Sequence, residues 1–215
     1  VQSSVYGPVC SSNWSGYYVP TDMINYVTAY FPVQSYSGGY WPETVMGEWV
    51  GVGGVINNSL IQAGVGQACP PLPTARFQSP WIWYETLPSD QEYIARVSPG
   101  DFVNTVITNG GGGYWKIQIT VYSPNSSPNI YTVCVSNYFA GYTMDFIVEG
   151  TGLENSGSYV SFPVSYAAFN GVWLYTACTS TTYSVYKVIE NTAGFIYTPT
   201  SVNTASNFTV VPSYS

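Results

Sequence analysis

The sequence contains no histidine, and only 7% of its residues are charged. Histidine is the commonest catalytic base and metal ligand near neutral pH. Its absence excludes Ser-His and Cys-His nucleophile pairs and most metal sites. Any catalysis must therefore use the 11 acidic residues, the 4 basic residues, or amide and hydroxyl groups.

The shortage of charge also predicts the environment of the protein. Acid unfolds proteins largely by protonating carboxylates that are paired in the native state and by charging buried histidines. This chain has few possible ion pairs that acid could break and no histidine that acid could charge, so low pH should destabilise it little. We therefore predict a secreted protein that is stable in an acidic extracellular environment.

Several other features that would identify a partner are missing. The net charge of −7 and the pI near 4.1 leave no basic stripe for nucleic acid. No apolar run approaches the ~18 residues that cross a bilayer, so no membrane span is expected.

The glycine run Gly110–Gly113 lacks the Gly-Lys-Ser/Thr of a phosphate loop and is predicted to be a hairpin loop. No cofactor is expected.

The four cysteines are far apart and form no Cys-x-x-Cys pair. Without such pairs or histidine a zinc site is not expected, and two disulfides are favoured over free thiols, with three connectivities open. The cysteines are Cys10, Cys69, Cys134 and Cys178. Four Asn-x-Ser/Thr acceptors favour a glycoprotein. They are Asn13, Asn57, Asn125 and Asn207.

What the sequence does contain is strand-like nearly throughout. Valine, isoleucine, threonine, tyrosine and tryptophan dominate, interrupted by glycine, proline, asparagine and serine. Trp115–Tyr122 and Thr143–Glu149 both alternate between two faces; Asp145, Ile147 and Glu149 share one face of the second segment. Asp22–Phe31 fits either a helix or a strand, and we favour a strand.

This pattern of many short strands predicts an all-β fold, an antiparallel two-sheet β-sandwich of jelly-roll or concanavalin-like type. No internal repeat, linker or charge run marks a boundary. Residues 1–215 are therefore expected to form a single β-sandwich catalytic domain, and we expect it to be a monomer.

Two polar residues in apolar segments are candidates for catalysis. Glu149 ends an apolar strand just before Gly150, and a partly apolar setting would raise its pKa as a general acid/base requires. Gln62 lies in the apolar segment Leu60–Gly66, where its amide could face a developing oxyanion. The structural alternatives are a strand-end glutamate in solvent and a core amide with ordinary hydrogen-bond partners.

Four segments occur in the order of the landmarks of one enzyme family. They are Ser12–Gly16, Trp49–Gly54 followed by Leu60–Gly64, Trp83–Glu85, and Phe146–Glu149. In these segments the chain resembles the glutamic peptidases (eqolisins), secreted acid endopeptidases that are insensitive to pepstatin. The resemblance implies that Gln62 and Glu149 form the catalytic dyad, that Trp14 and Trp49 line the substrate cleft, and that Glu85 neighbours the dyad.

The sequence departs from the family pattern beside this dyad. The family usually has an acidic residue at the position of Gly53, and Asn57 and Asn58 occupy a loop in which the fungal members carry a second aspartate. The loss of an acidic neighbour is expected to alter the pH optimum and the way in which Gln62 is held.

The resemblance implies hydrolysis of polypeptides by a bound water, without a covalent intermediate or a metal. Glu149 would act first as base and then as acid, and Gln62 would donate to the oxyanion. Two other functions remain open. One is a carbohydrate-binding or glycoside-hydrolysing jelly roll that uses Glu85 and Glu149 as facing carboxylates. The other is a non-enzymatic surface protein.

Overall fold

The computed structural model describes ten parts of the chain. These are residues 4–11, 14–20, 24–33, 44–69, 80–138, 140–152, 167–175, 184–192, 195–199 and 208–214. Among the described residues no helix of membrane-spanning length and hydropathy occurs.

The described secondary structure consists of β-strands, as the sequence predicts. The strands are β1 (Ser4–Ser11), β2 (Trp14–Pro20), β3 (Tyr26–Pro32), β4 (Thr44–Gly53), β5 (Leu60–Cys69), β6 (Trp81–Thr86), β7 (Glu92–Arg96), β8 (Phe102–Gly111), β9 (Tyr114–Tyr122), β10 (Asn129–Ser136), β11 (Thr143–Gly152), β12 (Ala167–Tyr175), β13 (Ser184–Thr192), β14 (Phe195–Pro199) and β15 (Phe208–Tyr214). The ambiguous segment Asp22–Phe31 contributes to strand β3, and Gly110–Gly113 lies at the β8–β9 hairpin, so both predictions are confirmed.

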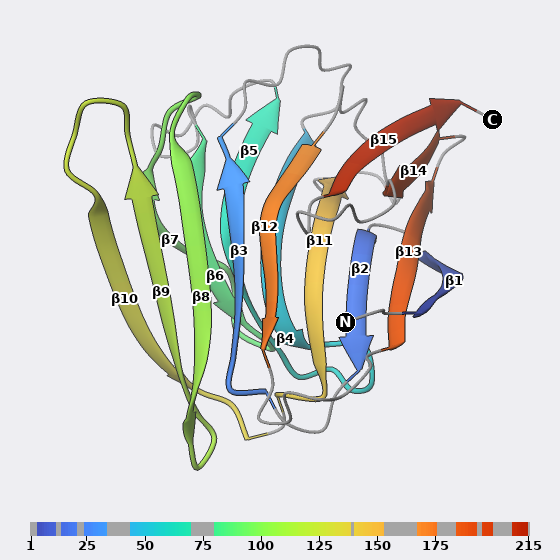
Figure 1. The fold of residues 1–215 in the computed structure, drawn as a ribbon, viewed down its shortest axis with the longest axis horizontal. Helices are drawn as coiled ribbons and strands as arrows, with labels where there is room; N and C mark the ends of the chain where they lie inside the picture. Colours follow the sequence, from blue (N-terminus) through green and yellow to red (C-terminus); the bar gives the residue numbers. More distant parts are fainter. Residues whose placement is uncertain are drawn as a thin grey trace.

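The strands form two layers that face each other as a sandwich (Figure 1). One layer has the order β10-β9-β8-β3-β12, and the other contains β13-β2-β11-β4-β5-β6-β7. Strands β15 and β14 continue the hydrogen-bonded path from β12 to β13. The pairs are antiparallel except β1 with β13, which are parallel, so the predicted antiparallel sandwich is confirmed with one exception.

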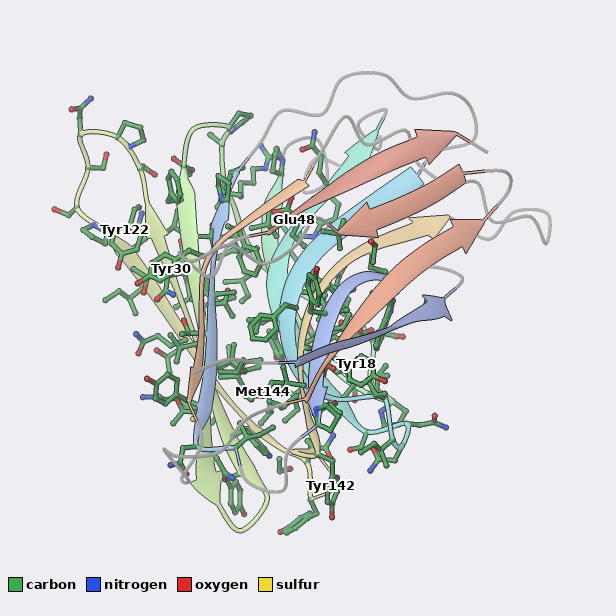
Figure 2. The ribbon with its side chains drawn as sticks, turned by 45° about the vertical axis from the view of Figure 1, so that its right-hand side comes forward. Tyr18, Tyr30, Glu48, Tyr122, Tyr142 and Met144 are labelled. Carbon is green, nitrogen blue, oxygen red and sulfur yellow. The ribbon has the colours of Figure 1, made fainter. Side chains whose placement is uncertain are left out.

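The main core lies between the layers and follows the predicted alternation. In β9 the residues Trp115, Ile117, Ile119 and Val121 are buried, whereas Lys116 and Tyr122 are exposed. On the opposing layer β11 contributes Met144, Phe146 and Val148 to the same cluster. Figure 2 shows Met144 between the two layers, and also Glu48 of β4. One face of β11 is therefore part of the core, which leaves the other face for a site.

The expectation of two disulfides is wrong. Cys134 is exposed and not part of a disulfide, because it lies on the outer strand β10, where its register partner on β9 is Lys116. The side chains of Cys10, Cys69 and Cys178 are outside the described residues. Of the glycan acceptors, Asn125 is exposed in the β9–β10 turn and Asn57 is partly buried, whereas Asn13 and Asn207 are outside the described residues.

The packing between the layers predicts the effect of truncating a core side chain. Phe146→Ala removes a nearly fully buried ring and should lower the free energy of unfolding by about 3–5 kcal/mol. The matched control is Ile130→Ala, whose side chain is 63% exposed on β10 and which should change stability by less than about 0.5 kcal/mol. Urea unfolding at pH 4 measures both, and equal effects would contradict this description of the core.

Candidate active site

The three strands β2, β11 and β4 bring the first group of predicted site residues onto one face. Residues directly opposite each other in an antiparallel pair share a face of the sheet. Glu149 of β11 is opposite Trp14 of β2, and Ile147, two residues before Glu149, is opposite Trp49 of β4. Trp14, Trp49 and Glu149 therefore lie on the face of β11 that points away from the main core.

The same face continues across β4, β5 and β6. Gly51, two residues after Trp49, is opposite Gln62 of β5, and Gln62 is opposite Glu85 of β6. All five predicted site residues thus lie on one face of five neighbouring strands, in the order β2-β11-β4-β5-β6. We call this surface the site face.

The floor of the site face is a second apolar cluster, separate from the main core. Its buried members are Trp49, Leu60, Trp81, Trp83 and Ile147, against which Trp14, Leu87 and Tyr93 pack. Carboxylate and amide groups that emerge from this floor have apolar neighbours on several sides. Such surroundings disfavour charge and strengthen hydrogen bonds.

Trp49 links the floor to Glu149. Its indole Nε1 donates a hydrogen bond of 2.9 Å to Oε2 of Glu149. Its ring meets that of Trp14 edge-to-face, with centroids 5.0 Å apart and an interplanar angle of 79°. Trp49 is completely buried in this structure, and its contact with the site is the bond to Glu149; that it lines the substrate cleft stays a prediction. Trp14 is only partly buried and is the more accessible of the two rings.

Two glycines of β4 make room for this indole. Atom Cδ1 of Trp49 lies 3.6 Å from the position that a β-carbon on Gly47 would occupy. Atom Cζ3 lies 2.9 Å from the corresponding position on Gly51, which is too close for a real side chain. The indole therefore lies along its own strand, and its five-membered ring carries the N–H toward Glu149.

Gln62 is held by Glu85. The Gln62 Nε2 group donates a short hydrogen bond to Oε2 of Glu85, while Gln62 Oε1 is buried without a partner among the described residues. Burial raises the pKa of the Glu85 carboxyl; the hydrogen bond from Gln62 lowers it, and the nearby charge of Asp90 raises it further. The Gln62 side chain is 5% exposed, so only a small part of the amide reaches the surface.

Gln62 and Glu149 share the site face but make no direct hydrogen bond with each other. Their register partners on β4 are Gly51 and Gly47, and Trp49 lies between these two positions. Each residue is fixed by a different hydrogen bond: Glu85 accepts from the Gln62 amide, and Trp49 donates to the Glu149 carboxylate. The arrangement offers one fixed amide and one fixed carboxylate above a common apolar floor.

Two further acidic side chains in this layer are buried, and sequence reasoning assigned a role to neither. Asp145 lies on the site face of β11, in register with Gly51 of β4 and Tyr18 of β2, and is completely buried. Glu48 of β4 lies on the opposite face and points between the layers (Figure 2). The signal for Asp145 was present in the sequence as an aspartate inside the apolar run Met144–Val148.

A hollow of about 550 Å³ lies beyond the Gln62–Glu85 pair. Its lining includes Thr86 and Leu87, which directly follow Glu85, together with Asn57, Asn137 and Tyr138. None of the described residues that line it is charged. Among the described residues no group of three or more histidine, cysteine, aspartate or glutamate side chains is placed to hold a metal ion. The chemistry that the described site face supports is therefore that of carboxylates and amides.

The Trp49–Glu149 bond can be tested against a second tryptophan of the same floor. Trp49→Phe removes a donor to a carboxylate and should cost about 2 kcal/mol more stability than Trp83→Phe. Trp83 is similarly buried, but its Nε1 has no partner among the described residues. Denaturant unfolding at pH 5.5 measures the difference. Equal costs would mean that the indole N–H of Trp49 contributes nothing.

Comparisons with solved structures and sequence families place this geometry among known proteins. The structure is similar to scytalido-glutamic peptidase with a transition state analog inhibitor, with a TM-score of 0.68, 19% identity, and coverage of 95% of this chain and 98% of that chain. It is similar to SCP-B, a member of the eqolisin family in complex with the tripeptide Ala-Ile-His, with a TM-score of 0.66, 19% identity, and the same coverages.

Aspergilloglutamic peptidase from Aspergillus niger is a further similar structure, with a TM-score of 0.54 and 17% identity over 80% of this chain and 99% of that chain. At these identities the likeness shows the shared fold. None of the curated protein sequences matches this chain significantly. The sequence profile of the Peptidase A4 family matches residues 12–213, and the chain therefore belongs to the Peptidase A4 family.

Proposed function

We propose that this protein is an acid endopeptidase that hydrolyses polypeptides with Gln62 and Glu149. Membership of the Peptidase A4 family implies peptidase activity. The observation that carries the assignment of residues is the site face itself, where an amide and a carboxylate are each fixed by a neighbour above one apolar floor.

In the proposed mechanism Glu149 is first the general base. It takes a proton from a water molecule that attacks the peptide carbonyl, and it then passes the proton to the leaving nitrogen. The bond from Trp49 fixes the orientation of the carboxylate for both transfers.

Gln62 stabilises the negative charge that develops on the carbonyl oxygen. A primary amide has two N–H donors, and Glu85 accepts one of them. With Glu85 Oε2 as the acceptor of one hydrogen, the second hydrogen of the amide remains for the oxyanion. An amide does not titrate, so this donor works unchanged at low pH.

The protonation state of the Glu85 carboxyl links the mechanism to acid conditions. An ionised carboxylate next to the amide would oppose the negative charge forming on the substrate. Burial raises the Glu85 pKa and so keeps this carboxyl neutral over a wider part of the acid range. Together with the low charge of the chain, this supports our proposal that the enzyme works outside the cell in an acidic environment, as a monomer.

Substitution of the two proposed catalytic residues tests the function. Glu149→Gln should abolish cleavage of denatured haemoglobin at pH 2 to 4, and Gln62→Ala should lower kcat about 100-fold or more, because one oxyanion donor is worth ~3 kcal/mol. The assay contains pepstatin to exclude contaminating aspartic peptidases. Glu92→Gln, an exposed carboxylate on β7, is the control and should retain full activity. Parent-level cleavage by Glu149→Gln would refute the assignment.

The pH profile tests Glu85 separately. Glu85→Gln keeps an oxygen that can accept from Gln62 but cannot ionise. We expect kcat/KM at pH 3 to stay within about threefold of the parent and its decline toward neutral pH to become shallower, because no charge forms beside the amide. A large loss of kcat/KM at pH 3 would instead mean that Glu85 acts as a proton donor.

A further inference from the structure

Asp145 is a buried acid that the proposed mechanism does not use. It is completely buried on the site face of β11. Its register partner on β4 is Gly51, and the other partner of Gly51 is Gln62 on β5. Asp145 and Gln62 thus lie on either side of the same glycine, and one oxygen of each is buried without a hydrogen-bond partner among the described residues.

The contacts around Thr143 bear on the protonation state of this acid. Thr143 Oγ1 donates to the carbonyl oxygen of Gly53 at 3.0 Å and lies 3.3 Å from Oδ2 of Asp145. A carbonyl can only accept, and a threonine hydroxyl has a single hydrogen. When that hydrogen is directed at Gly53, the nearer of the two acceptors, the 3.3 Å contact is a hydrogen bond only if a protonated Asp145 donates it.

The surroundings of Asp145 agree with a neutral acid. Among the described residues, the groups that lie beside it on the site face are Gly51 and Gly53 on β4, the phenol of Tyr18 on β2, and the acidic Glu149 farther along β11. None of these is a cation that could pair with an ionised Asp145. Burial raises the pKa of Asp145 well above its usual range, which favours the neutral acid; a Thr143 hydroxyl lowers this pKa only when its hydrogen points at the ionised carboxylate instead of at Gly53.

Gly53, at the other end of this chain of bonds, begins the turn that leads to Gln62. Its φ of +93° is a left-handed conformation that favours glycine, and an added β-carbon would collide with the carbonyl oxygen of Ser59. The N–H of Gly54 donates to the same oxygen at 2.8 Å and closes the turn. No acidic side chain fits at position 53; Asp145 of β11 is linked to the Gly53 carbonyl only through the Thr143 hydroxyl.

We propose that Asp145, as a neutral carboxylic acid, is a positioning residue that donates to Thr143 and thereby holds Gly53 and the β4–β5 hairpin that carries Gln62. The catalytic part of this proposal rests on the proposed function; the structural part does not. When Asp145 ionises, the donor is lost and an uncompensated charge is left in the sheet. The hairpin then loosens, and both stability and activity fall as the pH rises.

The direction of the pH effect follows from linkage. Because the folded-state pKa of Asp145 is raised, the unfolded chain releases this proton at a lower pH than the folded protein. The contribution to stability is complete below the unfolded pKa, near about 3.9. It is lost progressively as the pH rises from there through the folded-state pKa.

Asp145→Asn tests the proposal, because an asparagine amide can donate to Thr143 and cannot ionise. We expect the unfolding equilibrium constant to stay within about threefold of the parent at pH 3 and to be at least about tenfold smaller than that of the parent at pH 7. Glu92→Gln removes the same charge at an exposed position and should change neither value more than about threefold. A variant less stable than the parent at pH 7, or unable to fold at pH 3, would overturn the proposal.

An infrared measurement tests the protonation state without reference to stability. The parent at pH 6 should show the carbonyl band of a buried protonated carboxylic acid, and this band should be missing in Asp145→Asn and present in Glu92→Gln. An unchanged band in Asp145→Asn would overturn the assignment.

The pH dependence of kcat/KM separates this proposal from the proposed function. Asp145→Asn should retain activity at pH 3 and lose it at a higher pH than the parent does. A loss of more than about 100-fold at pH 3 would overturn the positioning role. If the stability results hold but the parent itself cleaves no protein at pH 3, the proposed function fails and the role of Asp145 in the hairpin stands.

Discussion

The site face depends on how the indole of Trp49 packs against β4. Gly47 and Gly51 leave the space along the strand that the ring fills, and the ring in turn fixes Glu149 through its N–H. The same ring is part of the apolar floor from which Gln62 and Glu149 emerge. A side chain on Gly51 would displace the ring and with it the carboxylate.

Two buried acids in this layer, Glu85 and Asp145, have neutral partners among the described residues. Glu85 accepts from an amide, and Asp145 contacts a hydroxyl; burial raises the pKa of both. A protein that keeps such groups neutral gains stability in acid and loses it as the pH rises. The absence of histidine and the low charge of the sequence also favour stability in acid, because they leave few groups whose protonation would unfold the protein.

The strands and the face of each strand that enters the core could be predicted from the sequence, because a single physical rule determines them. The alternation in Trp115–Tyr122 and Met144–Val148 identifies the core face, because the side-chain period of a strand is two. The resemblance predicts that Glu85 neighbours the dyad, but the hydrogen bond from the Gln62 amide to its carboxylate could not be predicted without the register of β5 and β6. The disulfide prediction failed because cysteine spacing carries no information on strand position, and Cys134 lies on an outer strand. The role of Asp145 depends on a hydroxyl and a carbonyl from two strands, which only the folded sheet brings together.

The central claim is that Gln62 and Glu149 act on the same peptide carbonyl. The most direct test is a crystal structure of the protein with a peptide-based transition-state analogue that carries a tetrahedral hydroxyl group. The account predicts one analogue oxygen about 2.7–3.1 Å from Gln62 Nε2 and a second at hydrogen-bond distance from the Glu149 carboxylate. An analogue whose tetrahedral centre binds away from either side chain would contradict it.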